Sequence, residues 1–322
     1  MRNRLLFPMR PITESKFDSS SANATPLGMK KAASRIVVIT GANTGIGAAC
    51  ALELARLSTN EQPVHLVLAC RSEEKTLPIL EKVRALGAEA SFVALDLGDL
   101  EASKRTGEEL AVRFPKVDLL VNNAGVAGAR GLTKQGFEVA FGTNHLGHFA
   151  FSAPLFPALQ HARGRVVNVS SGNHFKAKEL DFEAVRRTTK SRTGLPEYGV
   201  SKLANVLFTA EIRRRFPEIE AVAVNPGRIA SDIWRRVPKP FRAVLPWLLR
   251  MGTVEVGGHT LVNASHAKLS SELLYFHKLA PKDVNPLAKS PALAEALWAF
   301  SERAVRTAAP TGADAPRPNV LS

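Results

Sequence analysis

Short apolar runs alternate with segments of helical period through most of this chain, and this alternation limits the possible folds more than any other feature. The first six runs are rich in β-branched residues and apolar at both odd and even positions, as is typical of strands covered on both faces. The pattern predicts an α/β fold with a doubly wound, mostly parallel sheet of seven strands and helices on both faces. The expected strands are 35–40, 64–69, 91–96, 117–122, 165–170, 221–225 and 273–276, and the expected helices are about 46–58, 73–86, 99–114, 136–161, 196–216 and 252–267.

The alternation contains no internal boundary and no repeat, so we expect one domain over residues 34–307. The chain has 322 residues, of which 45% are apolar, and this is enough for a large buried core. Residues 1–33 mix Arg, Ser and Pro without a sustained period. They are interpreted as a disordered leader, as an organelle transit peptide, or as upstream sequence if the protein starts at Met29. The Pro/Ala-rich residues 308–322 are expected to form a disordered tail.

The formal net charge is +14, and it is scattered rather than gathered into a nucleic-acid-binding motif. We therefore expect a solvated basic surface and no nucleic-acid partner, with attraction of a phosphorylated cofactor or an acidic partner as the alternative. No apolar run reaches the about 18–20 residues that span a bilayer, which favours a cytoplasmic protein unless the leader directs it to an organelle. Cys50 and Cys70 cannot form a disulfide framework, and they favour a reducing compartment.

A glycine-rich turn, "TGANTGIG" at 40–47, follows the first expected strand and leads into a helix. Gly41, Gly45 and Gly47 allow the backbone to turn tightly and to approach a ligand closely. The free N–H groups and the positive dipole end of the following helix suit an anion such as a pyrophosphate. The spacing differs from G-x-G-x-x-G, but its place after the first strand favours dinucleotide binding, as in Rossmann folds, over a simple tight turn.

The second expected strand ends in Cys70, Arg71 and Ser72. Folds selective for NAD carry an acid here, which holds the ribose hydroxyls. Arg71 can instead bind a 2′-phosphate through a forked, charge-assisted contact. The sequence therefore predicts a preference for NADP(H) over NAD(H), and the alternative is an ordinary surface arginine at a strand end.

Seven short motifs together make the chain similar to the short-chain dehydrogenases/reductases, over about 240 residues. They are "TGANTGIG" 40–47, "LDLGD" 95–99, "NNAG" 122–125, "TNHLGHF" 143–149, "VVNVSS" 166–171, "YGVSK" 198–202 and "NPG" 225–227. The wording of "LACR", "TNHLGHF" and "YGVSKLAN" most resembles the retinol-dehydrogenase-like branch of that family. The resemblance implies a homo-oligomer as well, through the helices at about 99–114 and 136–161.

The resemblance also implies which residues act. The catalytic set that it implies is Asn144, Ser171, Tyr198 and Lys202, with Ser171 taken as the second serine of the doublet. Asn144 is implied to support a water-linked proton path behind Lys202. The residues expected at the cofactor are Gly41, Asn43, Thr44, Gly45, Ile46, Gly47, Arg71, Asp96, Leu97, Asn123, Ala124, Gly125, Tyr198, Lys202, Pro226, Gly227 and Ile229.

Tyr198 and Lys202 are four residues apart in a segment of helical period, so they share one helix face. A nearby ammonium favours a phenolate, so we expect Lys202 to lower the pKa of Tyr198. The tyrosine can then exchange a proton with an alcohol or a carbonyl while hydride moves at a nicotinamide. Ser171 would hold the substrate oxygen. Without the other motifs, the pair would be an ordinary amphipathic helix with a snorkelling lysine.

Substrate choice is expected to lie in residues 228–251, which are irregular and contain three prolines. Trp234 and its apolar neighbours are interpreted as a lid over the nicotinamide end, with a packed helix or a membrane-surface contact as alternatives. Residues 172–197 are expected to form another wall. An apolar lid favours an apolar substrate, and Ser171 and Trp234 are the substrate contacts we expect.

No metal site is expected, because His145 and His148 have no partner at ligand spacing. Both histidines are interpreted as packing or surface residues, and Tyr275 is interpreted as a core residue.

The leading hypothesis is an NADP(H)-dependent oxidoreductase that acts on a carbonyl/alcohol pair of a small molecule. The alternatives are a cofactor-binding regulator or scaffold with little turnover, and a basic nucleic-acid-binding protein with the same fold.

Overall fold

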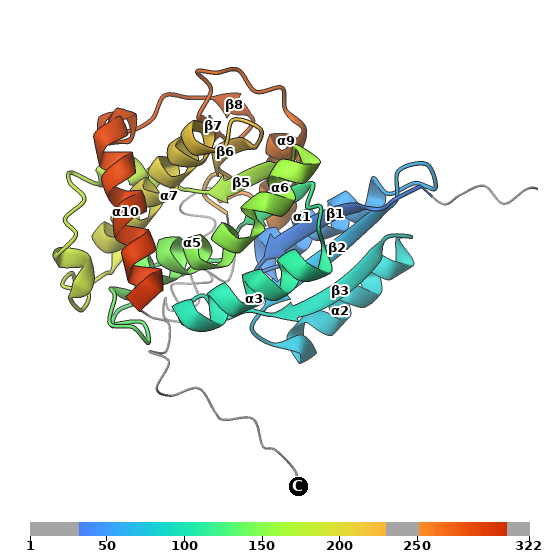
Figure 1. The fold of residues 1–322 in the computed structure, drawn as a ribbon, viewed down its shortest axis with the longest axis horizontal. Coiled ribbons are helices and arrows are strands. Elements are labelled where there is room, and N and C mark those ends of the chain that lie inside the picture. Colours follow the sequence, from blue (N-terminus) through green and yellow to red (C-terminus); the bar gives the residue numbers. More distant parts are fainter. Residues whose placement is uncertain (1–31, 230–250, 308–322) are drawn as a thin grey trace, which may run out of the picture. The chain divides into compact units, whose positions relative to one another are not determined.

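The computed structural model describes residues 32–229 and 251–307. Its sheet has the strand order β3-β2-β1-β4-β5-β6-β7-β8, and every neighbouring pair is parallel except β7 and β8 (Figure 1). The strands are β1 (Arg35–Thr40), β2 (Val64–Cys70), β3 (Glu89–Ala94), β4 (Leu119–Asn122), β5 (Arg165–Val169), β6 (Glu220–Asn225), β7 (Tyr275–His277) and β8 (Ala280–Pro281). The mostly parallel, doubly wound sheet predicted from the apolar runs is therefore confirmed.

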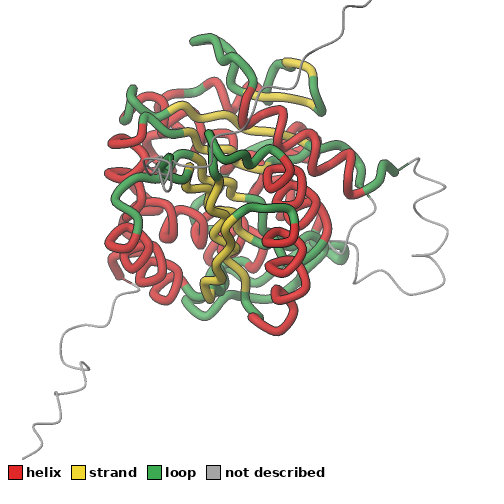
Figure 2. The backbone as a smooth tube through the Cα atoms, turned by 90° about the vertical axis from the view of Figure 1, so that its right-hand side faces the viewer, coloured by secondary structure: helices red, strands yellow, loops and turns green. Residues whose placement is uncertain are grey.

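Helices cover both faces of the sheet, which stands between them in Figure 2. They are α1 (Gly45–Arg56), α2 (Glu73–Ala85), α3 (Leu100–Arg113), α4 (Val139–Phe141), α5 (Gly147–Ser152), α6 (Phe156–Ala162), α7 (Leu195–Arg215), α9 (Val254–His266) and α10 (Pro291–Thr307). Helices α1, α2 and α9 pack on one face through residues such as Leu54, Leu80 and Leu261. On the other face, Phe149, Phe208 and Trp298 join α5, α7 and α10 in an aromatic cluster.

The chain winds outward from β1 to β3 and then crosses back to β4, so the direction of winding reverses between β1 and β4. Ligands of such sheets bind outside the carboxyl ends of the strands at this reversal. The glycine turn follows β1, and the "NNAG" segment follows β4. The topology therefore places both motifs at the same edge of the sheet.

The segment expected as one helix at 136–161 is interrupted. After α4 it passes through a π-helical turn (Gly142–Leu146), α5, a 3₁₀ turn (Ala153–Leu155) and α6. The 3₁₀ turn coincides with Pro154, which has no N–H for the helical ladder. A π-helical turn widens the backbone at one point, and such turns are frequent at functional sites; here it contains Asn144.

Two further expectations need correction, and one helix has no counterpart among the expected elements. The sheet has eight strands, because Lys278 and Leu279 form a tight turn that adds the two-residue antiparallel β8. Strand β3 ends at Ala94, so Asp96 lies in the following loop rather than in the strand. Helix α10 was not predicted, although its buried residues Ala294, Leu297, Ser301 and Ala304 recur at the helical interval.

Several sequence interpretations fall on residues outside the described ranges. These are the leader up to residue 31, the tail at 308–322, and residues 230–250 of the expected lid, including Trp234. Within the described ranges, none of the helices has the length and apolar character needed to cross a membrane.

Candidate active site

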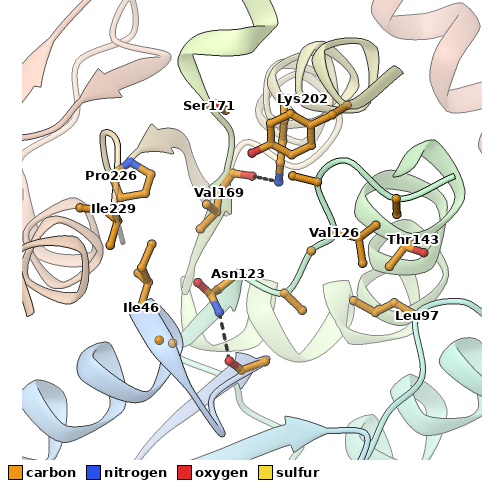
Figure 3. Close-up of a pocket in the computed structure, with 18 of the residues that line it drawn as sticks. Ile46, Leu97, Asn123, Val126, Thr143, Val169, Ser171, Lys202, Pro226 and Ile229 are labelled. Carbon is orange, nitrogen blue, oxygen red and sulfur yellow. Dashed lines mark hydrogen bonds between the residues drawn. The ribbon is translucent and has the colours of Figure 1, made fainter. Parts of the chain in front are cut away.

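A cavity of about 1480 Å³ opens at the carboxyl ends of the central strands. Figure 3 shows side chains from separate parts of the chain around it, with Ile46 and Asn123 on one side and Ser171 and Lys202 on another. Ser171 and all of the residues expected at the cofactor line this cavity. Of the remaining expected site residues, Asn144 does not line it, and Trp234 lies outside the described ranges.

The glycine turn has no room for side chains at Gly41 and Gly47. Gly41 has φ +67°, and a Cβ there would lie 2.9 Å from the Cβ of Ala124. A Cβ on Gly47 would collide with the carbonyl oxygen of Gly41 and lie 2.5 Å from Nδ2 of Asn123. Helix α1 has no side-chain cap at its start and no acid in its first turn. This turn therefore fits a pyrophosphate, which needs close backbone approach and a positive helix end.

The cavity is lined by cations where β2 ends. Arg71 and Lys75 are exposed and line the cavity, and Ser72 caps α2 by accepting from the Lys75 N–H at 3.3 Å. Asp96 comes from the neighbouring loop, where its Oδ1 accepts the Gly98 N–H at 3.0 Å. No residue from the end of β2 presents a carboxylate to the cavity.

Thr40, the last residue of β1, joins this turn to the loop after β4. Its Oγ accepts the backbone N–H groups of Asn123 and Ala124 at 2.9 and 3.0 Å. Asn123 also donates from Nδ2 to the Thr40 carbonyl at 2.8 Å. These bonds hold the loop that forms the floor of the cavity. Thr40 is the first residue of the "TGANTGIG" motif, and no role was expected for it from the sequence.

The opposite end of the cavity contains Tyr198 and Lys202 on α7, with Ser171 after β5. Lys202 donates from Nζ to the Val169 carbonyl at 2.8 Å, a bond drawn in Figure 3, and Nζ lies 5.6 Å from the centre of the Tyr198 ring. The Ser171 side chain lies close enough to Tyr198 to act on the pKa of its hydroxyl. The three side chains thus meet at one wall, although they come from positions up to 31 residues apart in sequence.

The expected lowering of the pKa of Tyr198 by Lys202 is wrong for the protein alone. Burial raises the pKa of Tyr198 to about 12, although its hydrogen bond with Ser171 acts in the opposite direction. Burial also lowers the pKa of Lys202 to about 7, so its ammonium is itself weakly held. Desolvation penalises both charged forms, and at these positions it outweighs the attraction between them.

Asn144 lies behind this wall rather than in the cavity. Its Oδ1 accepts the Val126 N–H at 2.8 Å, and its Nδ2 donates to the Val126 carbonyl and to the Ser201 hydroxyl at 3.0 and 2.9 Å. A Cβ on Gly125 would lie 3.0 Å from Asn144 Oδ1 and 3.6 Å from Lys202 Nζ. Gly125 therefore permits the close approach of Asn144 and Lys202.

The remaining residues interpreted from sequence have clear positions. His145 and His148 are both buried, so the packing alternative holds and the surface alternative is wrong. Tyr275 is fully buried as core. The described residues hold no His, Cys, Asp and Glu cluster suited to a metal ion. Lys176 and Arg228 also line the cavity, within the segments expected as a wall and a lid. His277 and Lys278 line it as well and were not expected there, although they directly follow an expected strand, where ligand contacts are common.

Comparison with known proteins identifies the family. The model of the short chain dehydrogenases matches residues 35–240. Human retinol dehydrogenase 13 is 33% identical to this chain over 300 residues, which cover 88% of each protein. Mouse retinol dehydrogenase 12 is 34% identical over 280 residues, which cover 83% of this chain and 85% of the mouse protein.

Solved structures agree in fold. An uncharacterized protein from Mycobacterium paratuberculosis has a TM-score of 0.66 at 30% identity, covering 84% of this chain and 93% of its own. A short-chain dehydrogenase from Sphingobium yanoikuyae in complex with NADPH has a TM-score of 0.59 at 21% identity, covering 89% and 98%. This chain therefore belongs to the short-chain dehydrogenase family, in its retinol-dehydrogenase-like branch.

Proposed function

We propose that this protein is an NADP(H)-dependent oxidoreductase that interconverts a carbonyl and an alcohol on a small molecule with an apolar body. The observation that carries the proposal is the meeting of two sites in one cavity. The glycine turn and Arg71 lie at one end, and Ser171, Tyr198 and Lys202 lie at the other. One cavity can therefore accept a dinucleotide and a second molecule together.

The protein's own residues would hold the cofactor and move the proton. The turn from Gly41 to Gly47 would bind the pyrophosphate, and the loop of Asn123 and Ala124 would lie along the cofactor. Bound NADP(H) supplies or accepts the hydride. Tyr198, with its pKa near 12, is a neutral phenol at neutral pH and can donate its proton to a carbonyl oxygen during reduction.

Ser171 and Lys202 would prepare that proton transfer. The Ser171 hydroxyl lines the same cavity as Tyr198 and can bind the same substrate oxygen, which would fix that oxygen within reach of the phenol. Lys202 would favour the phenolate that remains after donation, since an ammonium near a phenolate stabilises it. In the oxidation direction, the same groups would work in reverse.

The first experiment measures NADPH and NADH oxidation with a panel of apolar aldehydes. Wild type should consume NADPH, and Tyr198→Phe should lower kcat by at least about 100-fold, the usual size of a general acid contribution. Tyr275→Phe is the matched control, because it removes the hydroxyl of the other tyrosine, which is buried outside the cavity. Equal rates in wild type and Tyr198→Phe would reject the acid–base role, and the absence of NADPH oxidation by either protein would favour a cofactor-binding regulator.

The cofactor preference has its own test. Arg71→Asp should weaken NADPH binding by about tenfold or more and improve NADH binding, because it exchanges a phosphate partner for a ribose partner. Fluorescence titration of both cofactors measures this. Unchanged NADPH affinity would reject Arg71 as the phosphate contact.

A further inference from the structure

Among the described residues, carboxylates line only one part of the cavity. The carboxylates that line it are Asp96 and Asp99, both in the loop after β3, and Asp99 is paired with Lys134 at 2.7 Å. The catalytic end is lined by Lys176, Arg228 and Lys278, and the described residues place no carboxylate beside them on the cavity wall. The catalytic end is therefore cationic as well as apolar.

Within the described ranges, these three cations take no part in the ion pairs that stabilise the fold. All three are exposed, and no described ion pair includes any of them. They come from separate segments, which follow β5, β6 and β7. The sheet topology brings the ends of these strands together, so the three charges gather beside the wall that holds Ser171 and Tyr198.

His277 adds a neutral donor to the same end. Asn225 accepts the Gly227 N–H on Oδ1 at 3.0 Å, so its Nδ2 faces His277 and donates to Nδ1 at 2.8 Å. The ring proton of neutral His277 must then be on Nε2. Burial lowers the pKa of His277, and the nearby Lys282 and Lys278 lower it further, so the ring stays neutral and offers an N–H.

Lys278 has a backbone conformation that a lysine rarely adopts. It has φ +56° in the turn between β7 and β8, where glycine is normally preferred. Its side chain also runs over Gly227, because a Cβ on that glycine would lie 3.2 Å from Lys278 Cε and 3.5 Å from Cγ. A strained lysine held against a cavity by its stem suggests a requirement for its ammonium rather than for the turn.

We propose that Lys176, Arg228, Lys278 and His277 form an anion subsite, and that the substrate carries a carboxylate bound there while its carbonyl or hydroxyl reaches Tyr198. The inference rests on the proposed oxidoreductase function and narrows its substrate class to amphipathic acids. The cations would bind the carboxylate by charge and His277 by a hydrogen bond. The apolar side chains of Val126, Ala127 and Leu132, which also line the cavity, would contact the body of the molecule.

The first experiment compares 10-oxodecanoate with its methyl ester as substrates at saturating NADPH. Wild type should favour the acid in kcat/KM by about tenfold or more, which corresponds to about 1.4 kcal/mol. The preference should shrink at high salt, because exposed charges are screened. Lys278→Met keeps the stem over Gly227 and removes the charge, so it should lose most of the preference without changing the KM for NADPH. Lys116→Met, at an exposed lysine before the amino end of β4, is the matched control and should behave as wild type.

Lys278→Gly separates binding from folding. It should raise the melting temperature by relieving the positive φ, and it should still lose the preference for the acid. A variant that gains stability yet binds the acid as well as wild type does would contradict the proposal.

Binding of decanoate to the protein with NADP⁺, measured by calorimetry, tests the subsite without turnover, since decanoate has no carbonyl. Wild-type binding that weakens about tenfold in Lys278→Met supports the subsite even if neither aldehyde is reduced, and in that case only the proposed oxidoreductase function fails. Equal kcat/KM for acid and ester, together with no effect of Lys278→Met on decanoate, overturns the subsite and leaves the oxidoreductase function standing. A loss of NADPH affinity alone in Lys278→Met would assign this cation to the cofactor and also overturn the proposal.

Discussion

His148 is predicted to connect the loop of Asn123 and Ala124 to the Asn144 segment through hydrogen bonds that require one tautomer of its ring. Its Nδ1 lies 2.9 Å from the Asn144 carbonyl oxygen, so Nδ1 must carry the proton. Its Nε2, 2.9 Å from Thr40 Oγ, must then accept the threonine hydroxyl. This leaves Thr40 Oγ to accept the N–H groups of Asn123 and Ala124, and every proton in the chain of bonds has one position.

Replacing His148 by Phe keeps an aromatic ring and removes both bonds. The Asn144 carbonyl and the Thr40 hydroxyl would lose a partner in a buried place, and each such loss costs about 1–3 kcal/mol. The Thr40 hydroxyl can turn toward the Val121 carbonyl at 3.4 Å, which offsets part of its loss. We therefore expect the free energy of unfolding to fall by about 2–4 kcal/mol, and NADPH affinity to fall because the loop of Asn123 is less firmly held.

His145→Phe is the matched control, three positions earlier along the same segment. Ser301 donates its hydroxyl to the Leu297 carbonyl, so His145 Nε2 must donate to Ser301 Oγ at 2.9 Å. Its Nδ1 has no partner within the described ranges. The exchange removes one bond to Ser301 Oγ, but the Ser301 hydroxyl keeps its bond to the Leu297 carbonyl, and the new ring joins the aromatic residues Phe141 and Phe208. We expect the free energy of unfolding of His145→Phe to differ from that of wild type by no more than about 1.5 kcal/mol.

Urea unfolding followed by circular dichroism at pH 8 measures both variants. At this pH both histidines are neutral in the folded and unfolded states, so proton binding does not contribute. Equal losses of stability in the two variants, or a loss below about 1 kcal/mol in His148→Phe, would refute the tautomer argument, because stranding a buried partner is the only difference that it invokes.

The remaining predictions concern pH and the glycine turn. Burial lowers the pKa of His145 to about 3 from 6.5, so the unfolded chain binds an extra proton between these values and the free energy of unfolding falls as the pH is lowered. Between pH 8 and pH 5 this fall should be about 2 kcal/mol smaller in His145→Phe than in wild type under urea titration, while His148, whose pKa is lowered in the same way, contributes equally to both. Burial lowers the pKa of Lys202 to about 7 from 10.5, so the cofactor-free protein should gain about 1.5 kcal/mol of stability between pH 7 and 8.5; a Lys202→Met variant that keeps this gain would contradict the assignment. Gly47→Ala should weaken NADPH binding by about tenfold or more with an unchanged dichroism spectrum, because its Cβ would meet Gly41 and Asn123; retained affinity in a fluorescence titration would show that the turn adjusts freely.

Much of the fold could be predicted because strands and helices have local periods. The run at 35–40 was predicted to the residue, and Gly41 to Gly47 was placed correctly after it. The interruption near Asn144 could not be predicted in the same way, because a π-helical turn leaves no distinct pattern in the sequence and the residues from Thr143 to His145 are compatible with a continuous helix. Helix α10 differs from this turn, because the helical interval of Ala294, Leu297, Ser301 and Ala304 is present in the sequence itself.

The sequence by itself determined which residues gather at one edge of the sheet, because strand ends, glycine turns and helix starts are encoded by short-range sterics and hydrogen bonding. Only the tertiary structure decided their electrostatic state. The pKa of Tyr198 moves upward instead of downward, and Lys176, Arg228 and Lys278 line one cavity, because desolvation and the placement of charges depend on elements that are distant in the chain. The four-residue spacing of Tyr198 and Lys202 indicated a shared helix face, but the burial of that face determined how each group titrates.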